Sequence, residues 1–173
     1  MKTHEKYWSL LIHESAHAVS MLEYGLGLDH VQVFKTGLFG TGFEGNTRCG
    51  LLGFTEDDLA EDPAAFYQVK PAEQLISCLA SIPAQYRSLI EMGYSRWRAS
   101  SRTASCAKGD VEKGTILAQY SPWSWSKCKG EADEFVSDCW DEINVVAEGL
   151  LDAGGFLDGD DVVNLVEWSR AAV

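Results

Sequence analysis

The sequence has few basic residues, no paired cysteines and no long apolar run. Only 14 lysines and arginines face 26 aspartates and glutamates, and the net charge of −12 argues against nucleic acid as a partner, because phosphate binding needs a basic surface. No apolar stretch approaches the roughly 20 residues of a membrane span, so we expect no membrane insertion. The five cysteines are odd in number and include no CxxC pair, and no convincing secretory signal is present. We therefore expect free thiols and a cytoplasmic location.

What the chain does contain is enough apolar surface to build a core. Hydrophobic residues make up 46% of its 173 positions and include six tryptophans, which argues against general disorder. No internal repeat and no linker-like stretch divides it. We therefore expect one domain over residues 1–173.

Apolar spacing predicts an α+β fold that is predominantly helical. Alternation in residues 30–34 and a short apolar run at 51–55 predict two strands of a small antiparallel hairpin or sheet, joined by a mobile glycine-rich connection. The polar stretches 95–109 and 122–130 are expected to form loops. Helical spacing is found in residues 4–24, 71–92, 110–120, 131–151 and 157–173.

The most informative stretch is HESAH at residues 13–17, an instance of HExxH. Residues four apart share one face of a helix, so the imidazoles of His13 and His17 can reach one metal ion. Glu14 lies one position round the helix, from which its carboxylate can take a proton from a metal-activated water. The motif therefore predicts a Zn²⁺ site with His13 and His17 as ligands and Glu14 as the general base.

The motif supplies two ligands, whereas a catalytic zinc ion usually has three from the protein. The metzincin pattern requires glycine and histidine three and six positions after the second histidine, and this chain has Ser20 and Glu23 there, so that class is excluded. A thermolysin-like glutamate on a following helix would fall in the glycine-rich segment, which disfavours that class as well. His30 and Glu44 remain as weak candidates for the third ligand.

Beyond the motif, the chain resembles the peptidase domain of the FtsH family of ATP-dependent zinc metalloproteases. "GDVEKGT" at residues 109–115 is similar to the family's NDIERAT-like segment, and this resemblance implies Asp110 as the third zinc ligand. Order and approximate spacing also agree for "LLGFT" at 51–55, "LISCLASIPAQYRSL" at 75–89 and "GLLDAGGFLDG" at 149–159. The resemblance therefore covers nearly the whole chain, although only HESAH is specific by itself.

Some positions leave alternatives open. Asp110 begins a predicted helix, where aspartate is a favoured N-cap, and in that role its oxygens would meet the backbone N–H groups of residues 112 or 113, away from the histidines. Gln85 stands where the FtsH family has a glutamate, so a carboxylate that would support the ligands is missing. No GxxxxGK[ST] phosphate loop occurs, so we expect no ATPase within this chain.

The resemblance implies a stand-alone zinc endopeptidase that hydrolyses unfolded or flexible protein segments, with a separate ATPase or adaptor as a further partner. We expect the substrate to add to an exposed strand at 30–34, and residues 36–50 to serve as a flap. The alternative is a non-catalytic interaction protein that keeps a metallopeptidase fold and its metal. A basic cluster is expected in a solvated loop, from which it could attract acidic peptides if it borders the cleft. Its members are Arg87, Arg96, Arg98, Arg102 and Lys108.

Overall fold

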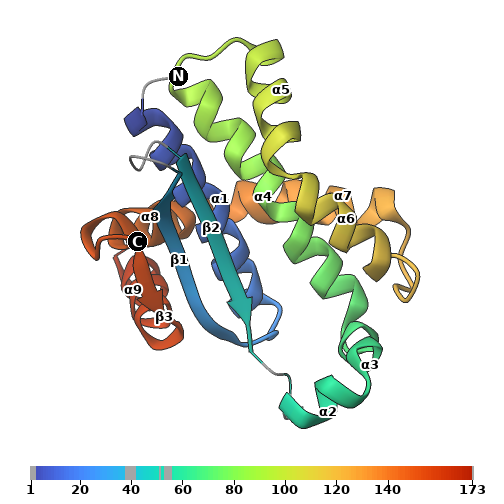
Figure 1. Cartoon of the computed structure of the whole chain (residues 1–173). Coiled ribbons are helices and arrows are strands. Elements are labelled where there is room, and N and C mark those ends of the chain that lie inside the picture. Colours follow the sequence, from blue (N-terminus) through green and yellow to red (C-terminus); the bar gives the residue numbers. More distant parts are fainter. Residues whose placement is uncertain (1–2, 38–41, 51, 53–55, 173) are drawn as a thin grey trace.

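Helices dominate the chain, and the described strands form one small sheet with helices on either side of it (Figure 1). The structure is a computed structural model and describes residues 3–37, 42–50, 52 and 56–172. It confirms the predicted α+β, predominantly helical class. In chain order the elements are α1 (Thr3–Glu23), β1 (Leu28–Thr36), β2 (Gly42–Cys49), α2 (Glu56–Glu61), α3 (Pro63–Gln68), α4 (Pro71–Glu91), α5 (Arg96–Cys106), α6 (Lys108–Leu117), α7 (Trp125–Asp138), α8 (Trp140–Asp152), β3 (Phe156–Asp158) and α9 (Gly159–Ala171).

The helix that carries HESAH lies at the centre of the fold. All residues of α1 from Leu11 to Met21 are buried, because α1 packs against α4, α8, β1 and β2. Its apolar side chains, such as Ile12 and Val19, belong to the main hydrophobic core. A helix buried on every side has no solvent to satisfy its polar residues. The histidines and the glutamate of the motif must therefore find partners inside the protein.

The sheet differs from the predicted hairpin in the place of its second strand. β2 occupies residues 42–49, within the segment expected to be a flap, and pairs antiparallel with β1. Of the strand predicted at 51–55, residue 52 lies in a turn and the others fall outside the described residues. The glycines made a real alternation hard to recognise, since Phe43, Gly45 and Thr47 are half-buried whereas Glu44 and Asn46 are exposed.

The strand order also corrects the predicted substrate edge. The order is β2-β1-β3, so β1 lies between two antiparallel partners and offers no free edge where it is paired. The prediction that residues 30–34 form the exposed edge strand is therefore wrong. The prediction failed because β3 is only three residues long, and no strand was expected directly after the helix that precedes it. Among the described strands, the edges of the sheet are β2 and β3.

Two stretches predicted as loops are largely helical. Residues 95–109 contain α5 and the beginning of α6, and Ser95 caps α5 by accepting from the backbone N–H of Arg98. Ser124 caps α7 in the same way at Lys127, inside the predicted break at 122–130. The single helix predicted at 131–151 is divided at Cys139 into α7 and α8. Serine N-caps were the available signal, because a serine oxygen satisfies an N–H that has no partner within the helix.

A second layer of helices packs against α1 through α4. α4 packs on α1 along one side and on α6 and α7 along the other, as Figure 1 also shows. A smaller apolar cluster joins these three helices through Leu75, Leu79, Leu117 and Cys128. This packing fixes the distance between α1 and α6. No helix in the described part of the chain is long and apolar enough to cross a membrane.

Candidate metal centre

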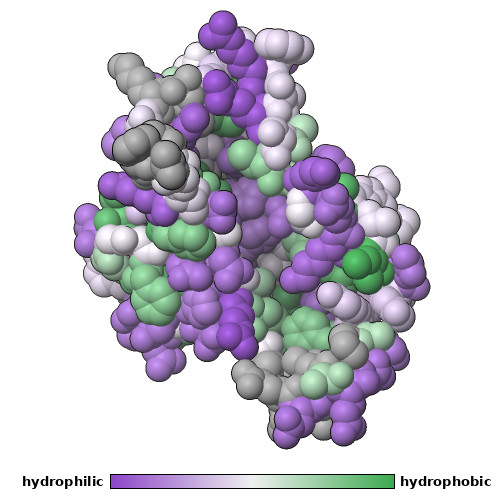
Figure 2. Space-filling model, in the orientation of Figure 1, coloured by the Kyte–Doolittle hydropathy of each residue, from purple (hydrophilic) through white to green (hydrophobic). Residues whose placement is uncertain are grey.

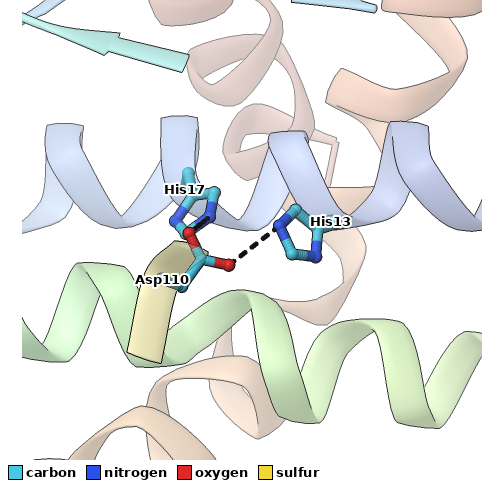
Figure 3. Close-up of side chains that lie close together, drawn as sticks. All are labelled: His13, His17 and Asp110. Atoms are coloured by element: carbon cyan, nitrogen blue, oxygen red, sulfur yellow. Dashed lines mark ion pairs between the residues drawn. The ribbon is translucent and has the colours of Figure 1, made fainter. Parts of the chain in front are cut away.

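Three side chains from two distant parts of the chain meet beside α4 (Figure 3). His13 and His17 project from consecutive turns of α1, and Asp110 faces them from the first turn of α6. The distance from His13 Nε2 to Asp110 Oδ2 is 3.1 Å, and that from His17 Nε2 to Asp110 Oδ1 is 3.3 Å. Within the part of the chain that the structure describes, this is the only group of three such side chains whose donor atoms lie close enough to hold one metal ion.

Asp110 is not the N-cap of its helix. α6 begins at Lys108, and its N-cap position is Ala107, whose methyl side chain cannot accept a hydrogen bond. The carboxylate of Asp110 instead receives a hydrogen bond from Ser81 Oγ, at 3.1 Å from Oδ2. Ser81 lies on α4, between the two helices that carry the cluster. The cap alternative for Asp110 is therefore wrong, and the carboxylate is oriented towards the histidines.

The ring of His17 is held in the orientation that a metal ligand needs. Its Nδ1 lies 2.8 Å from the carbonyl oxygen of Ser77, which can only accept, so Nδ1 carries the hydrogen. In the neutral ring Nε2 then has a lone pair directed at the carboxylate of Asp110. Two acceptors facing each other repel unless a cation lies between them or the ring gains a proton. This arrangement is typical of histidine ligands whose second nitrogen donates to a backbone carbonyl.

The pKa values of His17 and Asp110 also indicate that a positive charge between these side chains is favoured. Burial lowers the pKa of His17, but the hydrogen bond and charge of Asp110 outweigh it, so the pKa lies above its ordinary value. Burial raises the pKa of Asp110, but the hydrogen bonds from His13 and His17 outweigh it, so this pKa lies well below its usual range. The carboxylate is thus ionised in any physiological medium and attracts a cation.

Glu14 lies beside the cluster and does not join it. Its Oε2 accepts a hydrogen bond of 2.7 Å from Thr47 Oγ1 on β2, and its carboxylate packs closely on Gly45 of the same strand. The side chain is 5% exposed, yet it lines a cavity of about 230 Å³ together with His17 and Asp110. The predicted base is therefore positioned by the edge strand and faces the same space as two of the predicted ligands.

This cavity opens between the sheet and the α4–α6 layer. β2 contributes Gly45, Asn46 and Thr47 to its wall. In the view of Figure 2 the surface is hollowed between these two sides of the molecule. The cavity therefore gives a ligand access to the three-residue cluster along β2.

The other candidate ligands do not reach the cluster. His30 pairs with Asp29 at 3.0 Å and stacks on Phe156, and Glu44 is an exposed residue of β2. Cys78 also lines the cavity, and burial raises the pKa of its thiol to about 11, but among the described residues it does not belong to the group whose donor atoms could share one ion.

Gln85 takes a purely neutral role near His13. Its Nε2 donates to Ser9 Oγ at 3.0 Å, one helical turn before His13. Its Oε1 and His13 Nδ1 are both buried, and neither has a hydrogen-bond partner among the described residues. The carbonyl oxygen of Ser77 therefore orients the ring of His17, whereas no acceptor among the described residues orients the ring of His13 in this way. The supporting residues Ser77, Ser81 and Thr47 had no sequence signal, because single serines and threonines are common in helices and strands.

The donor set fits zinc. Two imidazole nitrogens and one carboxylate oxygen are ligands that Zn²⁺ commonly accepts, and tetrahedral bonds of 2.0–2.2 Å separate ligand atoms by about 3.4 Å. The nitrogen–oxygen distances of 3.1 and 3.3 Å within the cluster are close to that value. Three protein ligands leave a fourth position, which distinguishes catalytic from structural zinc sites.

The chain was compared with models of known protein families, with curated proteins and with solved structures, and none of the three comparisons finds a match. The resemblance to the FtsH peptidase domain thus rests on the residues quoted above.

Proposed function

We propose that this protein is a zinc-dependent endopeptidase of the FtsH-like, zincin type that hydrolyses unfolded or flexible protein segments in the cytoplasm. The observation that carries the proposal is the meeting of His13, His17 and Asp110 beside a cavity that Glu14 also lines. A buried ion-pair cluster of purely structural use would need no carboxylate next to it in a cavity. All five cysteines lack a disulfide partner, which supports a reducing compartment.

The proposed chemistry is the hydrolysis of a peptide bond by water. His13, His17 and Asp110 would hold Zn²⁺, which when bound lowers the pKa of water and polarises a carbonyl group. Glu14 accepts the proton of the attacking water at its carboxylate and delivers it to the amine that leaves. Thr47 restrains one oxygen of Glu14, so the other remains available for this transfer.

The substrate would be an extended chain laid along β2. Because β1 is the central strand and is paired on both sides at residues 30–32, β2 is the described strand that combines a free edge with the cavity. Backbone hydrogen bonds to an edge strand hold a peptide with little regard for its side chains. A cavity of about 230 Å³ admits a side chain but no folded domain. The substrate must therefore arrive unfolded, or be delivered by a separate ATPase or adaptor.

The test is cleavage of unfolded casein by the zinc-loaded protein beside its Glu14→Gln variant. We expect fragments from the parent protein, and none from the variant at equal zinc content. A parent protein that binds zinc and leaves casein intact would favour the alternative, a non-catalytic interaction protein with a metallopeptidase fold.

A further inference from the structure

The helix α5 has a basic face, formed by Arg98 and Arg102 one turn apart, in an otherwise acidic chain. It contains Arg96, Arg98 and Arg102 and no aspartate or glutamate, whereas the whole chain has a net charge of −12. Within the described residues, none of these three arginines forms an ion pair. Exposed arginines of this protein elsewhere do pair, as Arg170 does with two glutamates. The charge of α5 is therefore available to a ligand.

A groove runs beside this face. Its volume is about 1330 Å³, and its walls include Arg98, Arg102, Tyr94 and Trp97. Trp97 is 77% exposed, the most exposed of the large hydrophobic side chains described. The guanidinium of Arg102 lies 5.5 Å from the centre of the Tyr94 ring. One acid, Glu5, also lines the groove, and the hydroxyl of Tyr94 donates a hydrogen bond to it.

The groove continues towards the candidate metal centre. A second recess of about 330 Å³ shares Arg102 and Ser105 with it and reaches Gly42 and Phe43. These two residues begin β2, the strand that leads on to Glu14. An extended segment bound along α5 could therefore pass through the second recess onto the edge of β2.

We propose that this groove is an exosite for a substrate segment rich in aspartate and glutamate. Guanidinium groups bind carboxylates through paired hydrogen bonds, and the exposed rings of Trp97 and Tyr94 offer apolar contact to neighbouring side chains. A short acidic segment meets only this basic face. An extended nucleic acid would also meet the acidic remainder of the surface and be repelled. The inference rests on the proposed function, since it names the class of substrate for that site.

The test measures binding without cleavage. The zinc-loaded Glu14→Gln variant is mixed with a fluorescein-labelled peptide of alternating glutamate and alanine, or with the same peptide carrying glutamine, and fluorescence anisotropy is recorded. We expect the glutamate peptide to bind at least about tenfold more tightly, and added salt to weaken it. Arg98→Ala together with Arg102→Ala should weaken its binding about tenfold, as expected for two solvent-exposed charge pairs. Lys129→Ala removes one exposed charge on α7 and should change nothing.

The outcomes separate the two proposals. Equal binding of both peptides, binding unaffected by the arginine substitutions, or tighter binding of a single-stranded oligonucleotide would each overturn the exosite. Because Arg102 packs on Tyr94, Arg98→Ala alone, at an exposed position, must show about a threefold loss as well. Selective binding by a protein that never cleaves casein would keep the exosite and refute the peptidase. Cleavage of casein without selective binding of the glutamate peptide would keep the peptidase and refute the exosite.

Discussion

A single methyl group at Gly45 should reach the proposed general base without touching a metal ligand. A Cβ built at this position would lie 2.6 Å from Cδ of Glu14, whereas non-bonded carbon atoms prefer about 3.5 Å or more. The carboxylate of Glu14 would therefore have to retreat by about 1 Å, and its hydrogen bond with Thr47 would be lost or lengthened. A displacement of about 1 Å at a reacting group costs on the order of 10²-fold in rate. We expect Gly45→Ala to lower kcat on unfolded casein by about that factor.

The variant should remain folded, with a net loss of stability of no more than about 2.5 kcal/mol. Overpacking costs about 1–3 kcal/mol, and replacing glycine by alanine within a strand returns about 0.5–1 kcal/mol. Zinc content should stay the same, because the three atoms nearest to the Cβ added at Gly45 all belong to Glu14, which is not a ligand. The assays are casein hydrolysis, zinc content and thermal unfolding on one preparation.

Gly109 supplies the matched control. It lines the same cavity and directly precedes Asp110, but a Cβ built there would meet no atom within 4 Å. Gly109→Ala should therefore retain the activity of the parent protein. If Gly45→Ala retained it too, with its fold intact, Glu14 would not act from the position held by β2.

The remaining predictions concern the base, the ligands and the substrate. Glu14→Gln should keep zinc and lose about 10² to 10⁴-fold in rate, measured by casein hydrolysis, because an amide cannot accept the proton. His13→Ala should lose zinc, seen by native mass spectrometry, and with it about 2.7 kcal/mol of stability when free zinc in the parent sample is 100 times Kd. Asp110→Asn should weaken zinc binding in a competition titration with a chelator; unchanged affinity would remove Asp110 from the ligand set. The protein should leave a stably folded reporter intact, with or without ATP, since its 173 residues contain no phosphate loop.

The parts of the site that lie on one helix were predictable from the sequence. Four-residue spacing is a property of the helix itself, so the shared face of His13 and His17 required no knowledge of the fold. Asp110 was different, because only the packing of α4 between α1 and α6 brings it to the histidines. The resemblance of residues 109–115 to a segment of the FtsH family suggested Asp110 as a ligand, and no pattern in the neighbouring residues could have done so.

The features that the sequence did not predict depend on contacts with distant residues or on small residues. Glycines carry no side chain, so the alternation of β2 could not be seen around Gly45. The status of β1 as a central strand depends on β3, whose three residues are too few for a recognisable pattern. Thr47 positions Glu14 through one hydroxyl group, and the residues next to Thr47 in the sequence give no indication of this role. The long helices α1 and α4 were therefore predicted well, whereas the division between α7 and α8, the sheet and the supporting hydrogen bonds were not.

The most direct test of a catalytic zinc site is a titration of the metal-free protein with Zn²⁺, in which casein hydrolysis and bound zinc are measured at each step. We predict that activity rises in proportion to occupancy and reaches its limit at about one zinc ion per chain, as one site with three protein ligands requires. Full occupancy without hydrolysis, or hydrolysis by the metal-free protein, would contradict the account.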